Sequence, residues 1–206
     1  MAWFPLFLDL KDRNCLIAGG GKTALHKAVK LLEAQARLTV VAPVLDDSFL
    51  ELPIRHYCRT VRPEDVHGMT LVVDATGDVA AGFALAKACR ENGIFFDAAS
   101  NPEQGTALFP AVLRRGNFLA GISTLGASPA AAAWARDRLD EALPPRFDEI
   151  LQQMQELRAK AKTHISQQEQ RAAFLHTCLN AALAEGGPLT KESLEKIWRS
   201  VLNERE

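Results

Sequence analysis

The chain has 206 residues, of which 48% are hydrophobic, and its 24 basic and 25 acidic side chains give a net charge of -1. This length fits one large domain or one standard domain with an appendage, and the composition supports a buried core. The balanced charge gives no electrostatic argument for binding nucleic acid or a membrane surface, and no apolar run approaches the length of a membrane span. We therefore expect a cytoplasmic protein without nucleic-acid or membrane partners.

The apolar N-terminus raises the question of a signal peptide, but it lacks a basic start and charged residues interrupt it from Asp9 onward. The four cysteines are scattered and form no C-x-x-C pair, so neither a metal site nor a disulfide framework is expected. They are Cys15, Cys58, Cys89 and Cys178. Free thiols in a reducing cytoplasm are the plain interpretation.

An apolar run, a glycine-rich turn and a helix-favouring stretch follow one another between Cys15 and Ala34. The turn fits the dinucleotide fingerprint G-x-G-x-x-A, which ends at Ala24. Its glycines permit a sharp turn and a close approach of backbone amides to phosphate oxygens, and the helix start favours an anion. We predict pyrophosphate binding there, the alternative being a merely structural turn. The predicted contacts are Gly19, Gly20, Gly21, Lys22 and Thr23.

Strands and helices alternate after this turn, which indicates an α/β fold with a Rossmann-like parallel sheet. The expected elements are strands over Leu38–Ala42, His56–Arg62, Thr70–Ala75 and Ile94–Ala99, a turn over Pro63–Val66 that leads into a short helix, and a helix over Val79–Asn92 that stops at Asn92-Gly93.

Ligands of such sheets lie outside the carboxyl ends of the strands. We therefore add Ala42, Pro43, Ala75 and Thr76 to the predicted cofactor contacts. The tip of the second strand carries no carboxylate before Asp46, so its sequence does not by itself decide between NAD and NADP. The absence of a basic residue at this tip favours NAD.

The segment from Asp97 to Pro102 should border the same crevice, because it follows the last strand of the sheet. A carboxylate here can take part in chemistry or can simply cap a turn. Without further information, the turn cap is the larger expectation for Asp97.

The pattern changes after this segment. Ala107–Leu113 and Phe118–Ser123 are predicted to form a β-hairpin around the polar turn from Arg114 to Asn117. A helix follows over Ala130–Leu143, with Ser128 as its N-cap and Pro129 in its first turn. The rest is helical, with an apolar stripe that indicates core or a dimer interface. We predict three parts: residues 1–113, a β-hairpin/helix dimerisation region over 114–145, and a small all-helical C-terminal domain over 146–206.

These residues together resemble a known family. The most specific match is Ile122-Ser123-Thr124-x-Gly126-x-Ser128-Pro129, which a generic dinucleotide fold has no reason to carry. Further matches are Pro5–Leu10, the glycine turn with Lys27-Ala28, Leu38–Pro43, Ala75-Thr76, Pro102, Phe109–Ala111 and Arg114–Gly116. The chain resembles the bifunctional precorrin-2 dehydrogenase/sirohydrochlorin ferrochelatase family, the N-terminal half of siroheme synthase, over nearly its whole length.

The resemblance implies NAD as cofactor, precorrin-2 as the tetrapyrrole substrate and a homodimer that exchanges elements between subunits. The family reaction removes a hydride and protons from precorrin-2 to give sirohydrochlorin, and many members then insert ferrous iron to make siroheme. The methyltransferase half of fused siroheme synthases is not expected in this chain.

A ring with many carboxylates requires several cations at the rim of its site. Arginines cluster around the hairpin and the helix beyond it, namely Arg114, Arg115, Arg136, Arg138 and Arg146. Any one of them can equally be a solvated surface charge. With the resemblance, we predict substrate contacts at Arg114, Arg115, Ser123, Thr124 and Ser128, where the helix start can receive a carboxylate.

One departure from the family concerns catalysis. The family carries an acid–base aspartate two residues before the proline that matches Pro102, and this chain has Ser100 there. A serine hydroxyl is a poor base unless something activates it. Asp97 stands where relatives commonly have asparagine, and it can substitute if its carboxylate faces the crevice. The odd spacing of Asp97 and Ser100 points them to opposite faces of a regular strand.

Two hypotheses therefore remain. The first is an NAD-dependent precorrin-2 dehydrogenase with Asp97 and Ser100 as catalytic candidates and metal insertion in doubt. The second is a non-catalytic or repurposed tetrapyrrole- or nucleotide-binding protein on the same scaffold.

Overall fold

The computed structural model describes residues 3–203, with side chains through Val201. It divides into two compact units, the first ending at Phe109 and the second beginning at Pro110. This division falls just before the predicted boundary at residue 113. The further division of the second unit near residue 145 stays a prediction.

The first unit is built on a five-stranded parallel sheet with the order β3-β2-β1-β4-β5. Its strands are β1 (Asn14–Ala18), β2 (Arg37–Val41), β3 (Arg55–Tyr57), β4 (Leu71–Asp74) and β5 (Phe95–Ala98). The strand order reverses between β1 and β4, and the crevice at such a switch point is where open α/β sheets bind ligands. The predicted Rossmann-like sheet is confirmed.

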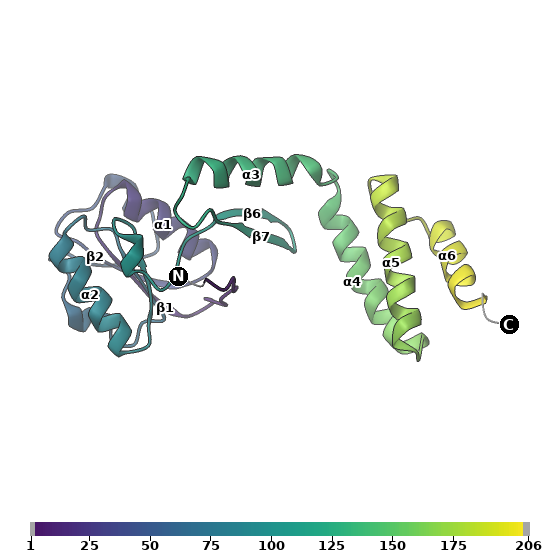
Figure 1. Cartoon of the computed structure of the whole chain (residues 1–206), viewed down its shortest axis with the longest axis horizontal. Helices are drawn as coiled ribbons and strands as arrows, with labels where there is room; N and C mark the ends of the chain where they lie inside the picture. The colour runs from purple at the N-terminus through teal and green to yellow at the C-terminus, as the bar shows by residue number, and fades with distance from the viewer. Residues whose placement is uncertain (1–2, 204–206) are drawn as a thin grey trace. The chain divides into compact units, whose positions relative to one another are not determined.

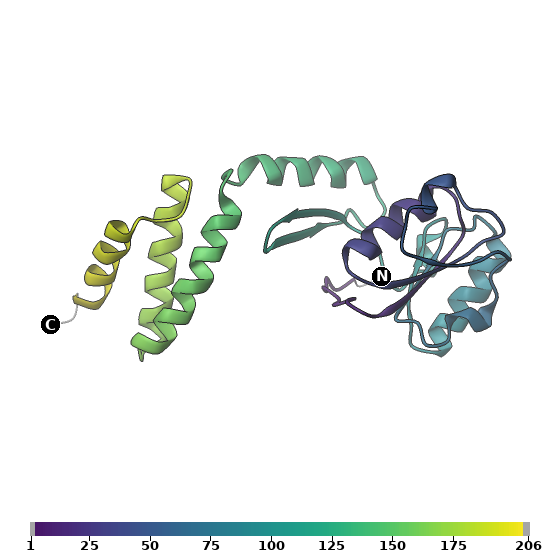
Figure 2. The same cartoon turned by 180° about the vertical axis from the view of Figure 1, so that it is seen from behind.

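Two helices cover the two faces of this sheet, and Figures 1 and 2 show the unit from opposite sides. Alternate residues of the central strands face opposite ways, so Ile17 packs with α1 (Lys22–Glu33) and Leu16 with α2 (Val79–Glu91). The central strands are buried on both faces, as their continuous apolar sequences require. Both helices start at the edge of the sheet where its strands end, directly after β1 and β4 in the chain.

Short 3₁₀ turns replace helices in the other connections of the sheet. They are η1 (Asp47–Phe49), η2 (Pro63–Val66) and, after β5, η3 (Pro102–Gln104). The prediction of a strand over His56–Arg62 was too long, because the ladder ends at Tyr57 and the amide of Arg59 turns back to the Tyr57 carbonyl at 2.9 Å.

The second unit opens with an antiparallel hairpin of β6 (Ala111–Arg115) and β7 (Phe118–Ile122), on which α3 (Pro129–Ala142) packs. The hairpin is confirmed, but its first strand starts later than Ala107. Pro110 has no amide to donate to the ladder, and the chain before it bonds to β5 instead. Arg114 and Arg115 therefore lie in the strand, and the turn is only Gly116-Asn117.

Three further helices complete the chain: α4 (Phe147–His164), α5 (Gln168–Glu185) and α6 (Lys191–Asn203). The predicted apolar stripe forms their shared core, with Ile150, Leu157 and Ala161 buried against Phe174 and Cys178. Gly186 ends α5 in the left-handed region, with φ of 70°. Within the described residues, no helix is both long and apolar enough to cross a membrane.

Candidate dinucleotide site

Gly19 lies where the ends of β1, β2 and β4 meet. Its φ is +115°, and a Cβ added there would overlap the backbone carbonyl of Ala75. Its amide donates to the carbonyl of Val41 at 3.0 Å, and the amide of Ala75 donates to Ala18 at 2.8 Å. Gly19 and Ala75 are therefore brought together at the switch point, as predicted, and only glycine fits the first position.

Gly20 is required by the loop that follows β2. A Cβ there would overlap the carbonyl of Val44 and lie 2.9 Å from a methyl of Leu45. The amide of Asp46 also donates to the carbonyl of Gly20 at 2.8 Å. The loop after β2 is thus fastened to the glycine turn, which brings the predicted contacts Ala42 and Pro43 to the same edge of the sheet.

Gly21 leaves the start of α1 open. It is the N-cap residue, it has no side chain to bond the first-turn amides, and a Cβ there would meet nothing within 4 Å. The first turn contains no acidic residue, and Lys22 and Thr23 are exposed in it. The first amides of a helix have no intrahelical partner and carry a partial positive charge. This start is arranged to bind an anion.

The start of α2 is closed by its own side chains. Asp78 Oδ1 accepts hydrogen bonds from the amides of Ala80 and Ala81 at 2.8 and 3.2 Å. The hydroxyl of Thr76 accepts from the amide of Asp78 and donates to the buried carboxylate of Asp74 at 2.7 Å. Thr76 follows β4 at the predicted edge, but its hydroxyl is already occupied and its amide also donates to Asp74 Oδ1, at 3.0 Å.

Asp74 also requires a glycine on the helix above it. A Cβ on Gly82 of α2 would lie 2.7 Å from Asp74 Oδ2. The glycine allows the helix to lie over a charged strand end.

The tip of β2 is held by β3. The amide of Ala42 donates to the carbonyl of Tyr57 at 3.2 Å. Nε2 of His56 is hydrogen-bonded to the carbonyl of Ala42 at 2.9 Å, and the thiol of Cys58 donates to the carbonyl of Pro43 at 3.1 Å. The residues just after β3 therefore lie beside the tip where a nucleotide ribose is expected.

Asp97 is buried beneath α1 instead of facing open solvent. Its side chain is 5% exposed, and Oδ2 accepts a hydrogen bond from Nζ of Lys27 at 2.5 Å. The amide of Phe109 also donates to this carboxylate, and the Lys27 ammonium lies 4.2 Å from the centre of the Phe109 ring. Burial raises the pKa of the Asp97 carboxyl, the lysine acting in the opposite direction. The catalytic role of Asp97 stays a prediction, and it now requires this ion pair to open.

Ser100 lies beyond the end of β5 and is exposed. Within the described residues its hydroxyl has no histidine, lysine or carboxylate as a hydrogen-bond partner that would activate it. The two catalytic candidates thus lie in different settings, one buried in an ion pair and the other exposed and unactivated.

The predicted substrate residues of the second unit include one structural clamp. Arg115 donates from Nε to Asp140 at 2.6 Å and from its two terminal nitrogens to the carbonyls of Asp140 and Pro144. Its guanidinium therefore fastens β6 to the end of α3.

The other arginines of the cluster differ in whether their side chains have an acidic partner. Arg136 and Arg138 pair with acidic neighbours on α3, and Arg146, the N-cap residue of α4, pairs with Glu149 of that helix. Arg114 is exposed on β6 and has no side-chain partner among the described residues, so it is the member that remains available for a substrate carboxylate.

The segment from Ser123 to Ser128 is a capping loop. Ser123 accepts from the amide of Leu125, and Thr124 bonds both the amide and the carbonyl of Ser128 at 3.0 and 2.9 Å. Ser128 in turn caps α3 by accepting from the amide of Ala131. These predicted substrate contacts have local structural partners, and their role toward a substrate stays a prediction.

Comparison with known proteins identifies the family. Residues 6–111, which include the whole parallel sheet, match the model of a family described as "Putative NAD(P)-binding". The chain belongs to this family. The match agrees with the geometry at the start of α1, and the residues there fit the pyrophosphate of NAD(P), since Gly19 and Gly20 close the turn while Gly21 leaves the first amides uncovered.

Curated relatives match further along the chain. A siroheme synthase of Nitrosomonas eutropha is 36% identical over 190 residues, covering 90% of this chain and 40% of the relative. A siroheme synthase of Nitrosospira multiformis is 32% identical over 216 residues, covering 100% of this chain and 46% of the relative. The chain thus spans less than half the length of these relatives.

A solved structure shares the fold. "SirC, precorrin-2 dehydrogenase" superposes with a TM-score of 0.75 at 23% sequence identity, covering 98% of this chain and 100% of that chain. This likeness extends through the hairpin and the terminal helices.

Sequence reasoning assigned no role to Lys27, although a signal was present. Lys27 follows Ala24 by three positions and precedes Leu31 by four, so it lies on the buried stripe of α1. A lysine on such a stripe requires a buried acidic partner. Which carboxylate it meets could not be read, because Asp97 is 70 positions away.

No cluster of side chains that could bind a metal ion lies among the described residues. Over the described range, histidine, cysteine, aspartate and glutamate side chains do not gather in groups of three that could hold an ion.

Proposed function

We propose that this chain is an NAD-dependent precorrin-2 dehydrogenase that produces sirohydrochlorin in siroheme biosynthesis. The observation that carries the proposal is the open start of α1 at the switch point of an NAD(P)-binding sheet, in a chain whose curated relatives are siroheme synthases. NAD, when bound, supplies the acceptor for the hydride that leaves the tetrapyrrole.

The chain's own residues would bind and orient the reactants. The first-turn amides at Lys22 and Thr23 bind the pyrophosphate, and Ala42, Pro43, Ala75 and Thr76 border the nucleotide. Arg114, which has no side-chain partner among residues 3–201, binds a substrate carboxylate. Ser123, Thr124 and Ser128 shape the loop before α3, and Arg115 holds β6 to that helix. Hydride transfer depends mainly on this positioning.

Proton removal is assigned to Asp97, with Ser100 as the second candidate. If Asp97 is the base, Asp97→Asn lowers turnover severely while NAD affinity stays unchanged, because the amide keeps the contact with Phe109. Ser100→Ala is the matched variant on the exposed side. An unaffected rate in Asp97→Asn would remove Asp97 from the mechanism.

The test of the function is conversion. Purified protein with NAD and precorrin-2 should develop the absorption bands of sirohydrochlorin, and omission of NAD should abolish them. Ferrous iron added afterwards tests whether the chain also inserts a metal, given that Ser100 replaces the family carboxylate. A protein that binds NAD and the ring but converts nothing would contradict dehydrogenation.

A specific observation favours a second candidate, a non-catalytic tetrapyrrole- or nucleotide-binding protein. The buried carboxylate of Asp97 is paired with Lys27, and the hydroxyl of Ser100 has no activating partner among the described residues. In that case the ring binds and remains precorrin-2.

We further propose that the chain forms a homodimer through its hairpin region. The hairpin packs on α3, and Val112 and Arg114 of β6 are exposed, which leaves a face of this two-stranded sheet for a second copy of the chain. Light scattering should give twice the chain mass. A monomer at micromolar concentration would contradict this assembly.

The cytoplasm is the proposed location. All four cysteines are free, and burial raises the thiol pKa of Cys15 and Cys178 to about 11 and of Cys89 to about 12, which keeps these thiols protonated and unreactive. Cell fractionation tests the location.

A further inference from the structure

The end of β3 carries two arginines next to the tip of β2. Three hydrogen bonds, from Ala42 to Tyr57, from His56 to Ala42 and from Cys58 to Pro43, hold the two strand ends together. Arg59 is the next residue, and Arg62 follows three positions later. In dinucleotide folds the end of the second strand meets the adenosine ribose, where a carboxylate bonds the 2′-hydroxyl of NAD or an arginine binds the 2′-phosphate of NADP.

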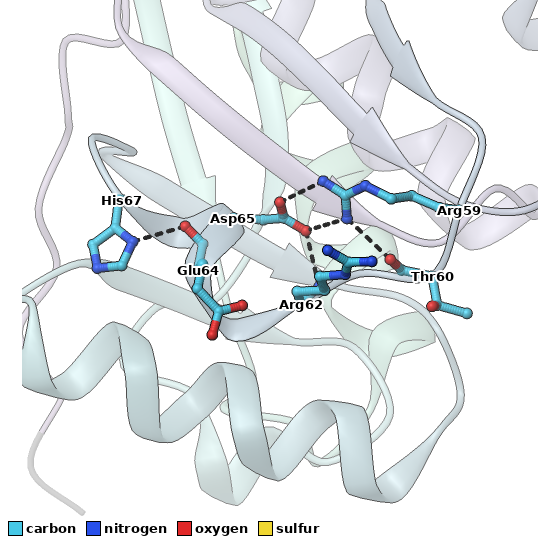
Figure 3. A network of polar contacts seen from close by, with 6 residues as sticks. All are labelled: Arg59, Thr60, Arg62, Glu64, Asp65 and His67. Carbon is cyan, nitrogen blue, oxygen red and sulfur yellow. Dashed lines mark hydrogen bonds and ion pairs between the residues drawn. The ribbon is translucent and has the colours of Figure 1, made fainter.

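The terminal nitrogens of the Arg59 guanidinium already hold a carboxylate of the chain. Its two terminal nitrogens bond the two carboxylate oxygens of Asp65 at 2.7 and 2.6 Å, and one of them also reaches the carbonyl of Thr60 at 3.0 Å. Figure 3 shows the fork of Arg59 facing the carboxylate of Asp65, with Arg62 beside the pair. A carboxylate in this geometry occupies the fork in the way a phosphate would.

Asp65 has a second contact that keeps it in place. Its Oδ2 accepts from the amide of Arg62 at 2.8 Å, at the start of η2. The Tyr57 ring lies 5.4 Å from the guanidinium on another side. The bonds from Arg59 hold the pKa of the Asp65 carboxyl below its usual range, so the partner remains charged.

The loop after β2 adds negative charge to the same edge. Asp46 donates its amide to Gly20 and turns its carboxylate to the amide of Ser48, and Asp47 follows it. A 2′-phosphate arriving at the tip of β2 would meet these acids and an arginine whose terminal nitrogens are paired with Asp65.

We propose that Asp65 determines the preference of this chain for NAD over NADP by holding Arg59 away from the ribose 2′ position. This inference rests on the proposed cofactor site at the start of α1. Asp65 acts through Arg59, so it is a positioning residue that does not itself touch the cofactor. The competing explanation is that the pair only braces the crossover between β3 and β4.

The experiment is calorimetric titration of the full chain with NAD and with NADP, comparing the ratio of the two Kd values. Asp65→Asn keeps the acceptor for the Arg62 amide but removes the charge that holds Arg59. The preference for NAD should fall about tenfold, since the freed guanidinium gains a charge-assisted bond to the phosphate. Glu64→Gln removes one charge from the adjacent position of η2 and should leave the ratio unchanged.

A second pair of variants tests the route through Arg59. Arg59→Gln alone should leave the ratio unchanged, because Arg59 is occupied in the wild-type chain. Arg59→Gln combined with Asp65→Asn should restore the wild-type ratio. This arm holds even if Asp65→Asn lowers stability, which thermal unfolding monitors.

Several results would overturn the inference while leaving the cofactor site intact. In each of them NAD binds normally. The ratio of the NAD and NADP Kd values stays the same in Asp65→Asn, or it changes in Glu64→Gln by as much as in Asp65→Asn. A third such result is a double variant, Arg59→Gln with Asp65→Asn, whose preference for NAD falls as far as that of Asp65→Asn alone. A wild-type chain that binds NADP as tightly as NAD would also overturn it. Failure of the wild-type chain to bind NAD at all would instead reject the proposed function, and the inference with it.

Discussion

The two helices that start at the crevice of the first unit begin in opposite ways. α1 follows β1 through Gly21, which offers its first-turn amides no side-chain cap. α2 follows β4, and its first turn is capped by Asp78, which Thr76 and Asp74 hold in place. The two helices follow neighbouring parallel strands of one sheet, so their starts share one edge.

The difference shows what makes an anion site in this fold. Every helix start has unsatisfied amides and a partial positive charge. At α2 a carboxylate of the chain bonds two of those amides, whereas at α1 glycine leaves them for a ligand. The switch point determines where a ligand binds, and the missing cap leaves the first-turn amides of α1 free to bind an anion.

The largest expected effect is the loss of stability on substitution of Gly19, whose backbone lies against Ala75 at the end of β4. Gly19→Ala should lower the free energy of unfolding by about 3 kcal/mol, because the added Cβ meets the Ala75 carbonyl at a φ that favours glycine. Urea denaturation measures this loss. The control is Gly21→Ala, which has open space and ordinary φ and should cost little; equal losses in both variants would contradict the distinction.

Gly21→Asp would convert the start of α1 into one like that of α2. The new carboxylate should cap the helix without loss of thermal stability and should weaken NAD binding about 100-fold, or about 2.7 kcal/mol, by repelling the pyrophosphate. Calorimetry measures the affinity, and Gly21→Asn separates the charge from the cap. Unchanged NAD affinity in Gly21→Asp would break the comparison.

The reverse change opens α2. Asp78→Ala removes the bonds to Ala80 and Ala81 and should cost about 1 kcal/mol in stability while NAD affinity stays the same. Asp78→Asn retains the cap and should lose less. A tenfold change in NAD affinity would mean that the phosphate lies at α2.

The smallest expected effect is a pH dependence of stability that arises from Asp65, in the connection between β3 and β4. The pKa of Asp65 is lowered in the folded chain by Arg59, so its stabilising effect is complete above the ordinary carboxyl pKa and is lost as pH falls through the lower, folded value. The stability difference between wild type and Asp65→Asn, about 1 kcal/mol for this partly buried pair, should shrink below about pH 4. A difference that is constant from pH 6 to pH 3 would contradict the charged pair.

The predictable parts of the fold were those encoded by neighbouring residues. Asn92-Gly93 ends α2 and Ser128-Pro129 starts α3 because caps and stops act within a few positions. The first strand of the hairpin was misplaced because Thr106 and Ala107 bond to Phe96, a contact that no local pattern reveals. The ladder of β3 was extended too far for a related reason, since Arg59 finds its partner six residues later.

The candidate site divides in the same way. The glycine turn could be predicted because its fingerprint lies within a few consecutive residues, although the groups that crowd Gly19 and Gly20 come from Ala75 and Val44. The setting of Asp97 could not, because its partners Lys27 and Phe109 come from other elements. The arginines of the hairpin region looked alike in sequence, and only their partners separate Arg114 from the paired members.

The most direct test of the open start of α1 is a crystal structure of the chain with NAD. The account predicts pyrophosphate oxygens within hydrogen-bond distance of the amides of Lys22 or Thr23, with the cap of Asp78 on α2 intact. A pyrophosphate bound elsewhere, with the first-turn amides of α1 facing only water, would contradict it.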